Sequence, residues 1–131
     1  MTIKHVEKCF VCSKDNPLGL RAHFFFQDGQ VQGEFTPNEN HQGPRNLMHG
    51  GLISALLDEA MSALIITGLN IDAATASLEV RFKNPARINE KLIIKAKLLN
   101  QHRRMNTASA TVEREDGTIV AEGKGKFFTK F

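Results

Sequence analysis

The sequence predicts an α+β domain in which an antiparallel β-sheet wraps around one long central helix. The first observation is the segment 50–66, GGLISALLDEAMSALII, which is long and apolar enough to form a helix buried almost all round. The second is that two strand patterns precede this helix and four follow it. The third is that the 131 residues contain no repeat, low-complexity tract or linker, so we expect a single domain over residues 1–131.

The chain before the helix begins with an irregular arm, residues 1–19, which ends in the turn Asn16-Pro17-Leu18-Gly19. Residues 20–27 and 30–36 then have the composition of two short strands. The dipeptide Asp28-Gly29 between them is a strong hairpin signal, because both residues tolerate the positive φ angles of a tight turn. We therefore expect these two strands to pair with each other.

The helix follows a loop, residues 37–46, that is rich in Pro, Asn, Gln and Gly. We expect the helix over about residues 48–67, ended by Gly68. Four later segments alternate apolar and polar residues over at least part of their length, as half-buried strands do: 74–82, 91–100, 105–114 and 118–130. The turn Asp116-Gly117 precedes the last of them. This order of elements is that of the hot-dog fold in outline.

Asp58 lies at the centre of the apolar helix pattern. An ionised carboxylate buried without partners costs several kcal/mol, so a carboxylate at this position needs a specific reason. Immediately upstream, His49-Gly50-Gly51 forms a glycine-rich helix start, whose free backbone N–H groups can point at a negatively charged oxygen. A carboxylate and an anion-binding helix start on one helix suggest acyl-transfer or hydrolysis chemistry. The alternative is a structural acid satisfied by the hydroxyl of Ser54 or Ser62.

Several stretches of the chain resemble hot-dog acyl-CoA thioesterases of the phenylacetate-degradation type. The resemblance is carried by residues 41–44, 48–61 and 75–85, and residues 9–20 are similar to uncharacterised bacterial members of that group. The spacing H-G-G-x6-D of residues 49–58, joined to T-x9-P of residues 75–85, is a fairly specific combination. The resemblance covers nearly the whole chain and implies an acyl-CoA substrate.

The resemblance also implies roles for individual residues. Asp58 matches the catalytic carboxylate, which acts as a general base on water or as a nucleophile. Gly50 matches the residue whose backbone N–H polarises the thioester carbonyl, and His49 matches the histidine that shapes that end of the site. Thr75 matches the hydroxyl residue that helps to hold the attacking water. The alternatives are a helix-entry role for His49 and a simple strand residue at position 75.

The chain departs from the family pattern at Gly43, where several members carry Asn or Gln six residues before the histidine. Gln42 and Asn46 are the candidates to replace that side chain. Further candidates for substrate binding are Gly51 and Glu59, the latter with a salt-bridge or dimer-interface role as the alternative. Arg81 and Lys83 are candidates to hold the phosphates of coenzyme A, because Lys and Arg are the usual phosphate ligands. A solvated basic face is the alternative for these two.

The spacing within the helix predicts a homo-oligomer. Gly50 and Asp58 are eight residues apart, which is about 12 Å along a helix. A single carbonyl group cannot lie within reach of both, as acyl-transfer chemistry requires. Two antiparallel helices across a two-fold axis remove this difficulty, since each Asp58 then lies opposite the partner's Gly50. We therefore expect a dimer at least, and possible assembly of dimers into a tetramer.

Cys9 and Cys12 form a single C-x-x-C motif. A structural zinc ion prefers about four ligands, and the sequence has no second cysteine pair to complete such a site. The turn-rich residues that follow do not favour a thioredoxin-like redox motif. We expect a structural pair of small thiols, with no metal and no cofactor. The alternative is a metal site to which His5 or His23 contributes.

The remaining partners follow from charge and hydropathy. A net charge of +3 is too small to indicate nucleic acid on its own. No segment reaches about 18 uninterrupted apolar residues, and the first residues lack the apolar core of a signal peptide. We expect no membrane partner and a cytoplasmic location. The preferred function is a thioesterase; the alternatives are a non-catalytic acyl-CoA-binding or sensor protein and an acyl-CoA hydratase or dehydratase.

Overall fold

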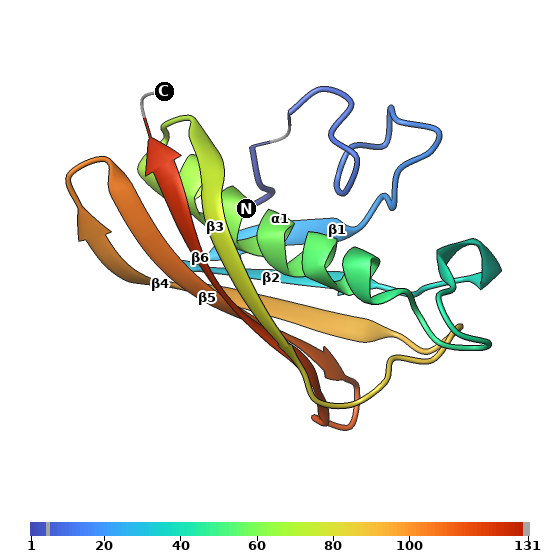
Figure 1. Ribbon diagram of the computed structural model, residues 1–131. Coiled ribbons are helices and arrows are strands. Elements are labelled where there is room, and N and C mark those ends of the chain that lie inside the picture. The colour runs from blue at the N-terminus through green and yellow to red at the C-terminus, as the bar shows by residue number, and fades with distance from the viewer. Residues whose placement is uncertain (5, 130–131) are drawn as a thin grey trace.

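The computed structural model describes residues 1–4 and 6–129 and shows an antiparallel six-stranded sheet curved around helix α1 (Figure 1). In chain order the elements are β1 (His23–Gln27), β2 (Gln30–Phe35), a 3-10 turn η1 (Glu39–His41), α1 (Gly50–Leu69), β3 (Ala73–Phe82), β4 (Leu92–His102), β5 (Met105–Arg114) and β6 (Ile119–Thr129). The strands are ordered β1-β2-β4-β5-β6-β3 across the sheet. The predicted α+β hot-dog architecture is confirmed; the turn η1 is an element that the sequence did not predict.

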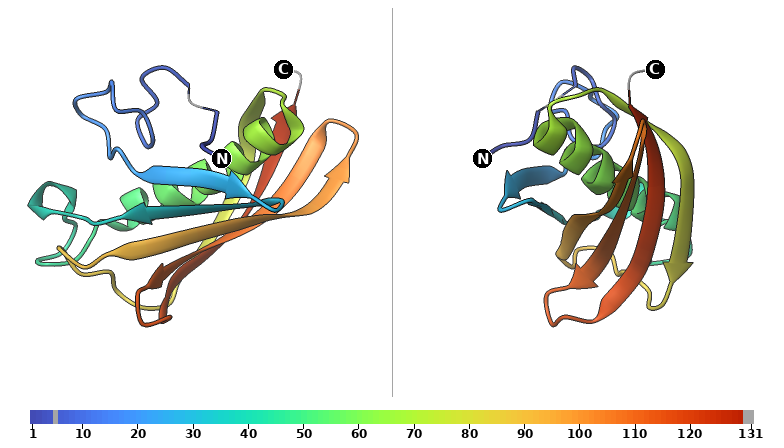
Figure 2. Two further views of the ribbon diagram at one scale, coloured as in Figure 1. Left: turned by 180° about the vertical axis from the view of Figure 1, so that it is seen from behind. Right: turned by 90° about the vertical axis from the view of Figure 1, so that its left-hand side faces the viewer.

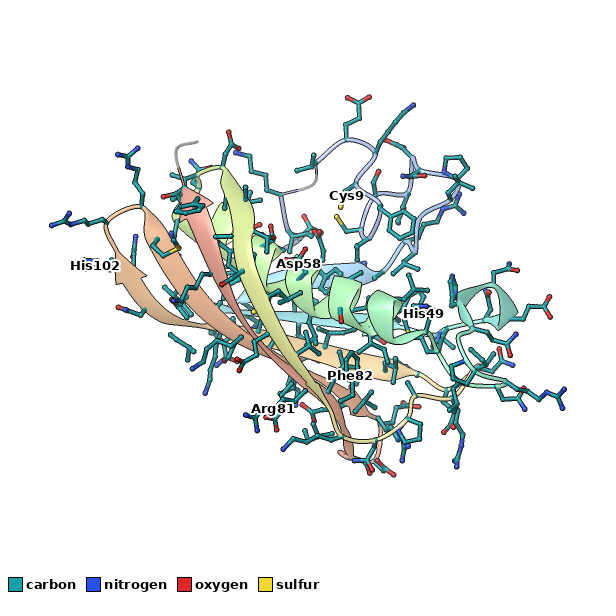
Figure 3. The ribbon with its side chains drawn as sticks, in the orientation of Figure 1. Cys9, His49, Asp58, Arg81, Phe82 and His102 are labelled. Atoms are coloured by element: carbon teal, nitrogen blue, oxygen red, sulfur yellow. The ribbon has the colours of Figure 1, made fainter. Side chains whose placement is uncertain are left out.

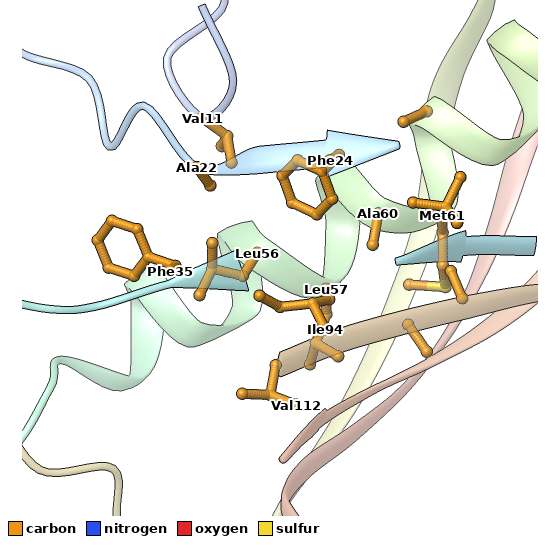
Figure 4. Close-up of a cluster of buried hydrophobic side chains, with 14 of the residues drawn as sticks. Val11, Ala22, Phe24, Phe35, Leu56, Leu57, Ala60, Met61, Ile94 and Val112 are labelled. Carbon is orange, nitrogen blue, oxygen red and sulfur yellow. The ribbon is translucent and has the colours of Figure 1, made fainter. Parts of the chain in front are cut away.

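The core lies between α1 and the inner face of the sheet (Figure 4). Leu57 and Met61 of the helix are fully buried, as are Ile94 and Val112 of the central strands. Gly123 of β6 allows this close packing, because a Cβ there would lie 3.3 Å from the Leu57 Cδ1 atom. The sheet therefore holds α1, and the groups that it carries, in a fixed position.

Helix α1 is less buried in the single chain than its sequence predicts. Eight of its 20 residues are buried, whereas a stripe that includes Leu52, Ala55 and Asp58 is only partly covered. The helix also has the length and apolar composition of a membrane span, although here it forms the core of the domain. The expectation of a helix buried all round is therefore wrong for one chain, because the curved sheet covers only part of its circumference.

The end of α1 also differs from the expectation. The helix continues past Gly68 to Leu69 and is capped by Asn70, which adopts the left-handed conformation at φ 54°. Gly68 serves packing instead, since a Cβ on it would lie 3.1 Å from the ring of Phe26. The glycine is a site of close approach rather than the residue that ends the helix.

The arm, residues 1–19, crosses the side of α1 that the sheet leaves open (Figure 2). The expected first strand begins at His23 rather than residue 20, because the preceding segment bonds to the arm. Leu20 donates its N–H to the carbonyl of Phe10, and Ala22 donates to Val11. The segment 20–22 therefore anchors the arm to the domain instead of extending the sheet.

Strand β3 is one edge of the sheet and, among residues 1–4 and 6–129, pairs only with β6. An irregularity between Thr75 and Ser77 shifts its register, so Thr75 faces α1 together with Leu78 and Phe82 further along the strand. Leu78 is 37% exposed and Phe82 is 56% exposed. The single chain thus presents an unpaired strand edge whose inner face is partly apolar and uncovered.

Candidate active site

Asp58 and Thr75 meet where the middle of α1 faces the first residues of β3. The hydroxyl Oγ1 of Thr75 donates a hydrogen bond of 2.7 Å to the Asp58 carboxylate oxygen Oδ1. Asp58 is half-buried, and among the described residues its second carboxylate oxygen has no hydrogen-bond donor (Figure 3 labels the residue on α1). Among the described residues, no hydrogen bond joins Asp58 to Ser54 or Ser62. The structure therefore pairs the carboxylate with the predicted threonine rather than with a helix serine.

The start of α1 leaves one backbone donor without an acceptor. His49 is the N-cap, and its Nδ1 accepts from the Gly51 N–H at 2.8 Å. The N–H groups of Leu52 and Ile53 donate to the His49 carbonyl. Within the described residues nothing accepts from the Gly50 N–H. Gly50 is therefore the free donor of the first turn, and Gly51, the other predicted candidate, has its N–H already bonded.

This cap also fixes the tautomer of His49 when the ring is neutral. Because Nδ1 accepts from an N–H group, it carries no proton, and the ring proton is on Nε2. The side chain of His49 is exposed, at the end of α1 nearest the loop (Figure 3). The residue is both the helix-entry residue and an exposed polar group beside the Gly50 donor.

A cavity of about 350 Å³ lies beside Gly50. Its lining is mainly apolar and includes Leu47, Ile53, Phe82 and Pro85. The Phe82 ring lies so near the helix start that a Cβ on Gly50 would be 3.5 Å from it. An apolar group could enter this cavity with its polar end close to the free N–H.

The loop before α1 lies directly against His49 at Gly43. A Cβ on Gly43 would lie 3.0 Å from the His49 Cα atom, so the loop has little room for a side chain there. Both polar atoms of Gln42, a candidate to replace the missing helper side chain, are bonded within the loop: its Oε1 accepts from the Asn46 N–H and its Nε2 donates to the Glu39 carbonyl. Asn46 is exposed, with a positive φ of 62°. Both residues shape the loop.

Arg81 and Lys83 lie away from Asp58. Arg81 lines a hollow of about 510 Å³ together with Lys95 and Lys124. This hollow is on the face of the sheet opposite α1, because Arg81 alternates along β3 with Phe82, which lies beside the helix start. Lys83 forms an ion pair of 3.2 Å with Glu122 at the end of β3. The structure therefore does not bring the two basic candidates to the carboxylate within one chain.

Glu59 faces the arm rather than the Asp58–Thr75 pair. Its Oε1 accepts from the Cys9 thiol Sγ at 3.3 Å, and Cys12 completes the cluster. Burial raises the pKa of Glu59, and burial together with the nearby Glu59 charge raises the pKa of Cys12. The predicted thiol pair thus has a carboxylate neighbour that the sequence did not reveal, because 50 residues separate Glu59 from Cys9. His5 lies outside the described residues, and His23 is exposed on β1.

The free Gly50 donor and the Asp58 carboxylate belong to one helix but not to one reacting centre. Eight residues of α1 separate them, which corresponds to about 12 Å along the helix axis. A carbonyl group polarised by the Gly50 N–H is too far from the same chain's Asp58 for water activated there to attack it. The two halves of the site are present, but a single chain does not bring them together.

Comparison with known proteins agrees with the fold and the motif. A model of the thioesterase superfamily matches residues 45–121. Mouse acyl-coenzyme A thioesterase 13 is 27% identical over 93 residues, which cover 70% of this chain and 66% of that protein. The thioesterase superfamily protein RHA08564 superposes with a TM-score of 0.79 at 27% identity, covering 86% of this chain and 58% of that one. The Escherichia coli PaaI protein of the phenylacetic acid degradation operon shares the fold, with a TM-score of 0.79, 17% identity, and 86% and 81% of the chains covered.

The family match includes the helix with Gly50 and Asp58 and the strand with Thr75. The chain therefore belongs to the thioesterase superfamily, which confirms the resemblance seen in the sequence. The matches span slightly less than two thirds of the mouse protein and 58% of the RHA08564 chain.

Proposed function

We propose that this protein hydrolyses acyl-CoA thioesters at a site that two chains build together, with Asp58 from one chain and the Gly50 N–H from its partner. The observation that carries the proposal is the unused Gly50 donor on the same apolar helix as a carboxylate already positioned by Thr75. Membership of the thioesterase superfamily and the similarity to an acyl-coenzyme A thioesterase support the reaction class.

The chemistry follows from the two groups. Asp58 takes a proton from water, and the resulting hydroxide attacks the thioester carbonyl carbon. The carbonyl oxygen becomes an oxyanion, which accepts a hydrogen bond from the Gly50 N–H at the positive end of the helix dipole. Collapse of this intermediate breaks the C–S bond and expels the coenzyme A thiolate, which takes up the proton from Asp58. The products are a free acid and coenzyme A, and the carboxylate is regenerated.

The dimer is supported by the uncovered strand edge. Two β3 strands pairing antiparallel across a two-fold axis would satisfy the free edge and cover Leu78 and Phe82. The same arrangement sets the two α1 helices antiparallel and side by side, which brings each Asp58 toward the opposite helix start. The apolar cavity at Gly50 would then receive part of the acyl-CoA substrate.

The test is release of free thiol from a panel of acyl-CoA thioesters by the purified protein. Asp58→Asn should lower kcat by several orders of magnitude without unfolding the chain, because an amide does not accept the proton from water. Asp72→Asn is the matched control, since Asp72 is exposed beyond the helix and has no role in the proposal. The assignment of Asp58 as the base fails if Asp58→Asn keeps more than about a tenth of wild-type activity.

The same panel separates the alternatives. A non-catalytic acyl-CoA sensor would bind the thioesters without releasing thiol, and a hydratase would change the acyl chain and leave the thioester intact. Either outcome with a folded protein would overturn the hydrolase proposal.

A further inference from the structure

The arm and the central helix bring three metal-ligating groups to one place outside the site described above. The thiols of Cys9 and Cys12 and a carboxylate oxygen of Glu59 all lie within 4.8 Å of one another. Figure 3 shows Cys9 between the arm and α1. We propose that Cys9, Cys12 and Glu59 bind one zinc ion, which clamps the arm to α1.

Local backbone structure places the two thiols side by side. The Ser13 N–H donates to the Cys9 carbonyl at 3.1 Å, which closes a single turn over the C-x-x-C segment. Residues three apart on such a turn lie on the same side, so both sulfur atoms face the helix. The adjacent Val11 is buried and helps to hold the turn in place. The motif is therefore shaped for a ligand pair before any ion binds.

The distances fit a tetrahedral zinc site after a small contraction. Zinc lies about 2.3 Å from a thiolate sulfur and about 2.0–2.2 Å from a carboxylate oxygen, so its ligand atoms are roughly 3.5 Å apart. The Cys9 Sγ and the Glu59 Oε1 are already 3.3 Å apart. The remaining separations, which are at most 4.8 Å, need to shorten by no more than about 1.3 Å, a movement within reach of side-chain rotation. The fourth position would be taken by water or by the second carboxylate oxygen.

The charge of the cluster also indicates a cation. Two thiols and a carboxylate are all groups whose deprotonated forms are negative. In the described part of the chain no ion pair involves Glu59; the four pairs found there lie elsewhere on the surface. A zinc ion would offset two of the three negative charges of the deprotonated ligands, and the two thiolates select zinc over magnesium or calcium.

The position of the cluster couples the arm to the candidate active site. Glu59 follows Asp58 directly in α1. The arm is bonded to the domain near both of its ends, where the Lys4 N–H donates to Thr67 Oγ1 of α1 and where Phe10 and Val11 accept from residues 20 and 22. A bound ion would fix the arm to the helix at the turn that carries the catalytic carboxylate. This role is structural and independent of the hydrolysis proposed above.

The proposal is tested with the untagged, reduced, full-length protein and cobalt as a spectroscopic substitute for zinc. Titration with Co²⁺ should give a thiolate-to-metal charge-transfer band and the visible spectrum of a tetrahedral ion. The signal should saturate at about one ion per chain and disappear on addition of zinc. After dialysis, elemental analysis should also find about one zinc per chain.

Four variants separate the cluster from adventitious binding. Cys9→Ser with Cys12→Ser should abolish the charge-transfer band, and Glu59→Gln should weaken binding by at least about tenfold. Glu7→Gln, which removes an exposed carboxylate of the arm, should bind the ion as the wild type does. Asp58→Asn should also bind normally, so failure of the hydrolase proposal leaves this test unaffected. The site is refuted if the wild type, with both thiols titratable, gives no charge-transfer band or binds no more zinc than the double serine variant.

Discussion

Replacing Thr75 by Val tests whether its hydroxyl positions Asp58, the proposed catalytic carboxylate. The substitution keeps the β-branched shape that suits strand β3 and removes only the donor of the 2.7 Å bond to Asp58. A hydrogen bond to a charged acceptor contributes about 1.5–3 kcal/mol. Thr75 is exposed in the single chain, so water can partly replace the lost donor, and we expect the lower end of that range. About 1.4 kcal/mol corresponds to a tenfold fall in kcat.

The assay is steady-state hydrolysis of the best acyl-CoA substrate by wild type, Thr75→Val and Thr75→Ser. The expected result is a roughly tenfold lower kcat with little change in KM for Thr75→Val, because the hydroxyl acts through Asp58 and not on the bound substrate. Thr75→Ser retains the donor and should recover most of the rate. An unchanged kcat in Thr75→Val, or an equal loss in Thr75→Ser, would show that position 75 only fills the strand.

Three further predictions concern the loop, the strand edge and pH. Gly43→Ala places a Cβ about 3.0 Å from the His49 Cα, so it should cost about 1–3 kcal/mol in urea unfolding and lower kcat by moving the helix start. Phe82→Arg should prevent the proposed dimer, so that light scattering finds monomers, and abolish hydrolysis, whereas Leu99→Arg, at a site 46% exposed on β4, should do neither. Burial lowers the pKa of His41, whose Nδ1 accepts from the Asn38 N–H. The stability that neutral His41 contributes to the fold is therefore fully present above about pH 6.5 and is lost as the pH falls through the lower folded-state pKa. Urea unfolding across this range should show a smaller loss in His41→Gln, and an equal loss would contradict the assignment.

Most of the sheet was predictable from sequence because its strands alternate and because the hairpins β1–β2 and β5–β6 have the expected turns at Asp28-Gly29 and Asp116-Gly117. The register irregularity between Thr75 and Ser77 was not, although it decides which residues of β3 face the helix. Regular alternation would place Thr75 and Leu78 on opposite faces, since they are three residues apart. Only the pairing with β6 shows that both face α1.

The candidate site was predictable where function depends on local backbone. The glycine-rich helix start and the spacing to Asp58 can be read in one segment, and the cap formed by His49 leaves the Gly50 donor free as expected. Contacts between distant segments could not be read in this way. The cluster of Glu59 with Cys9 and the use of Gly68 to accommodate Phe26 both depend on how the arm and β1 cross the helix.

The most direct test of the two-chain site is a mixed dimer of Asp58→Asn chains and Gly50→Pro chains. Proline removes the N–H and is tolerated at a first helical position, and the preceding His49 already has the extended conformation that proline requires, with φ −61° and ψ 131°. Each homodimer should be nearly inactive, provided that circular dichroism shows both variants to be folded. After subunit exchange, the equimolar mixture should recover roughly a quarter of wild-type activity, since half of its dimers are mixed and each has one intact site of two. Verified exchange with no activity above that of the two parents would contradict a site shared between chains.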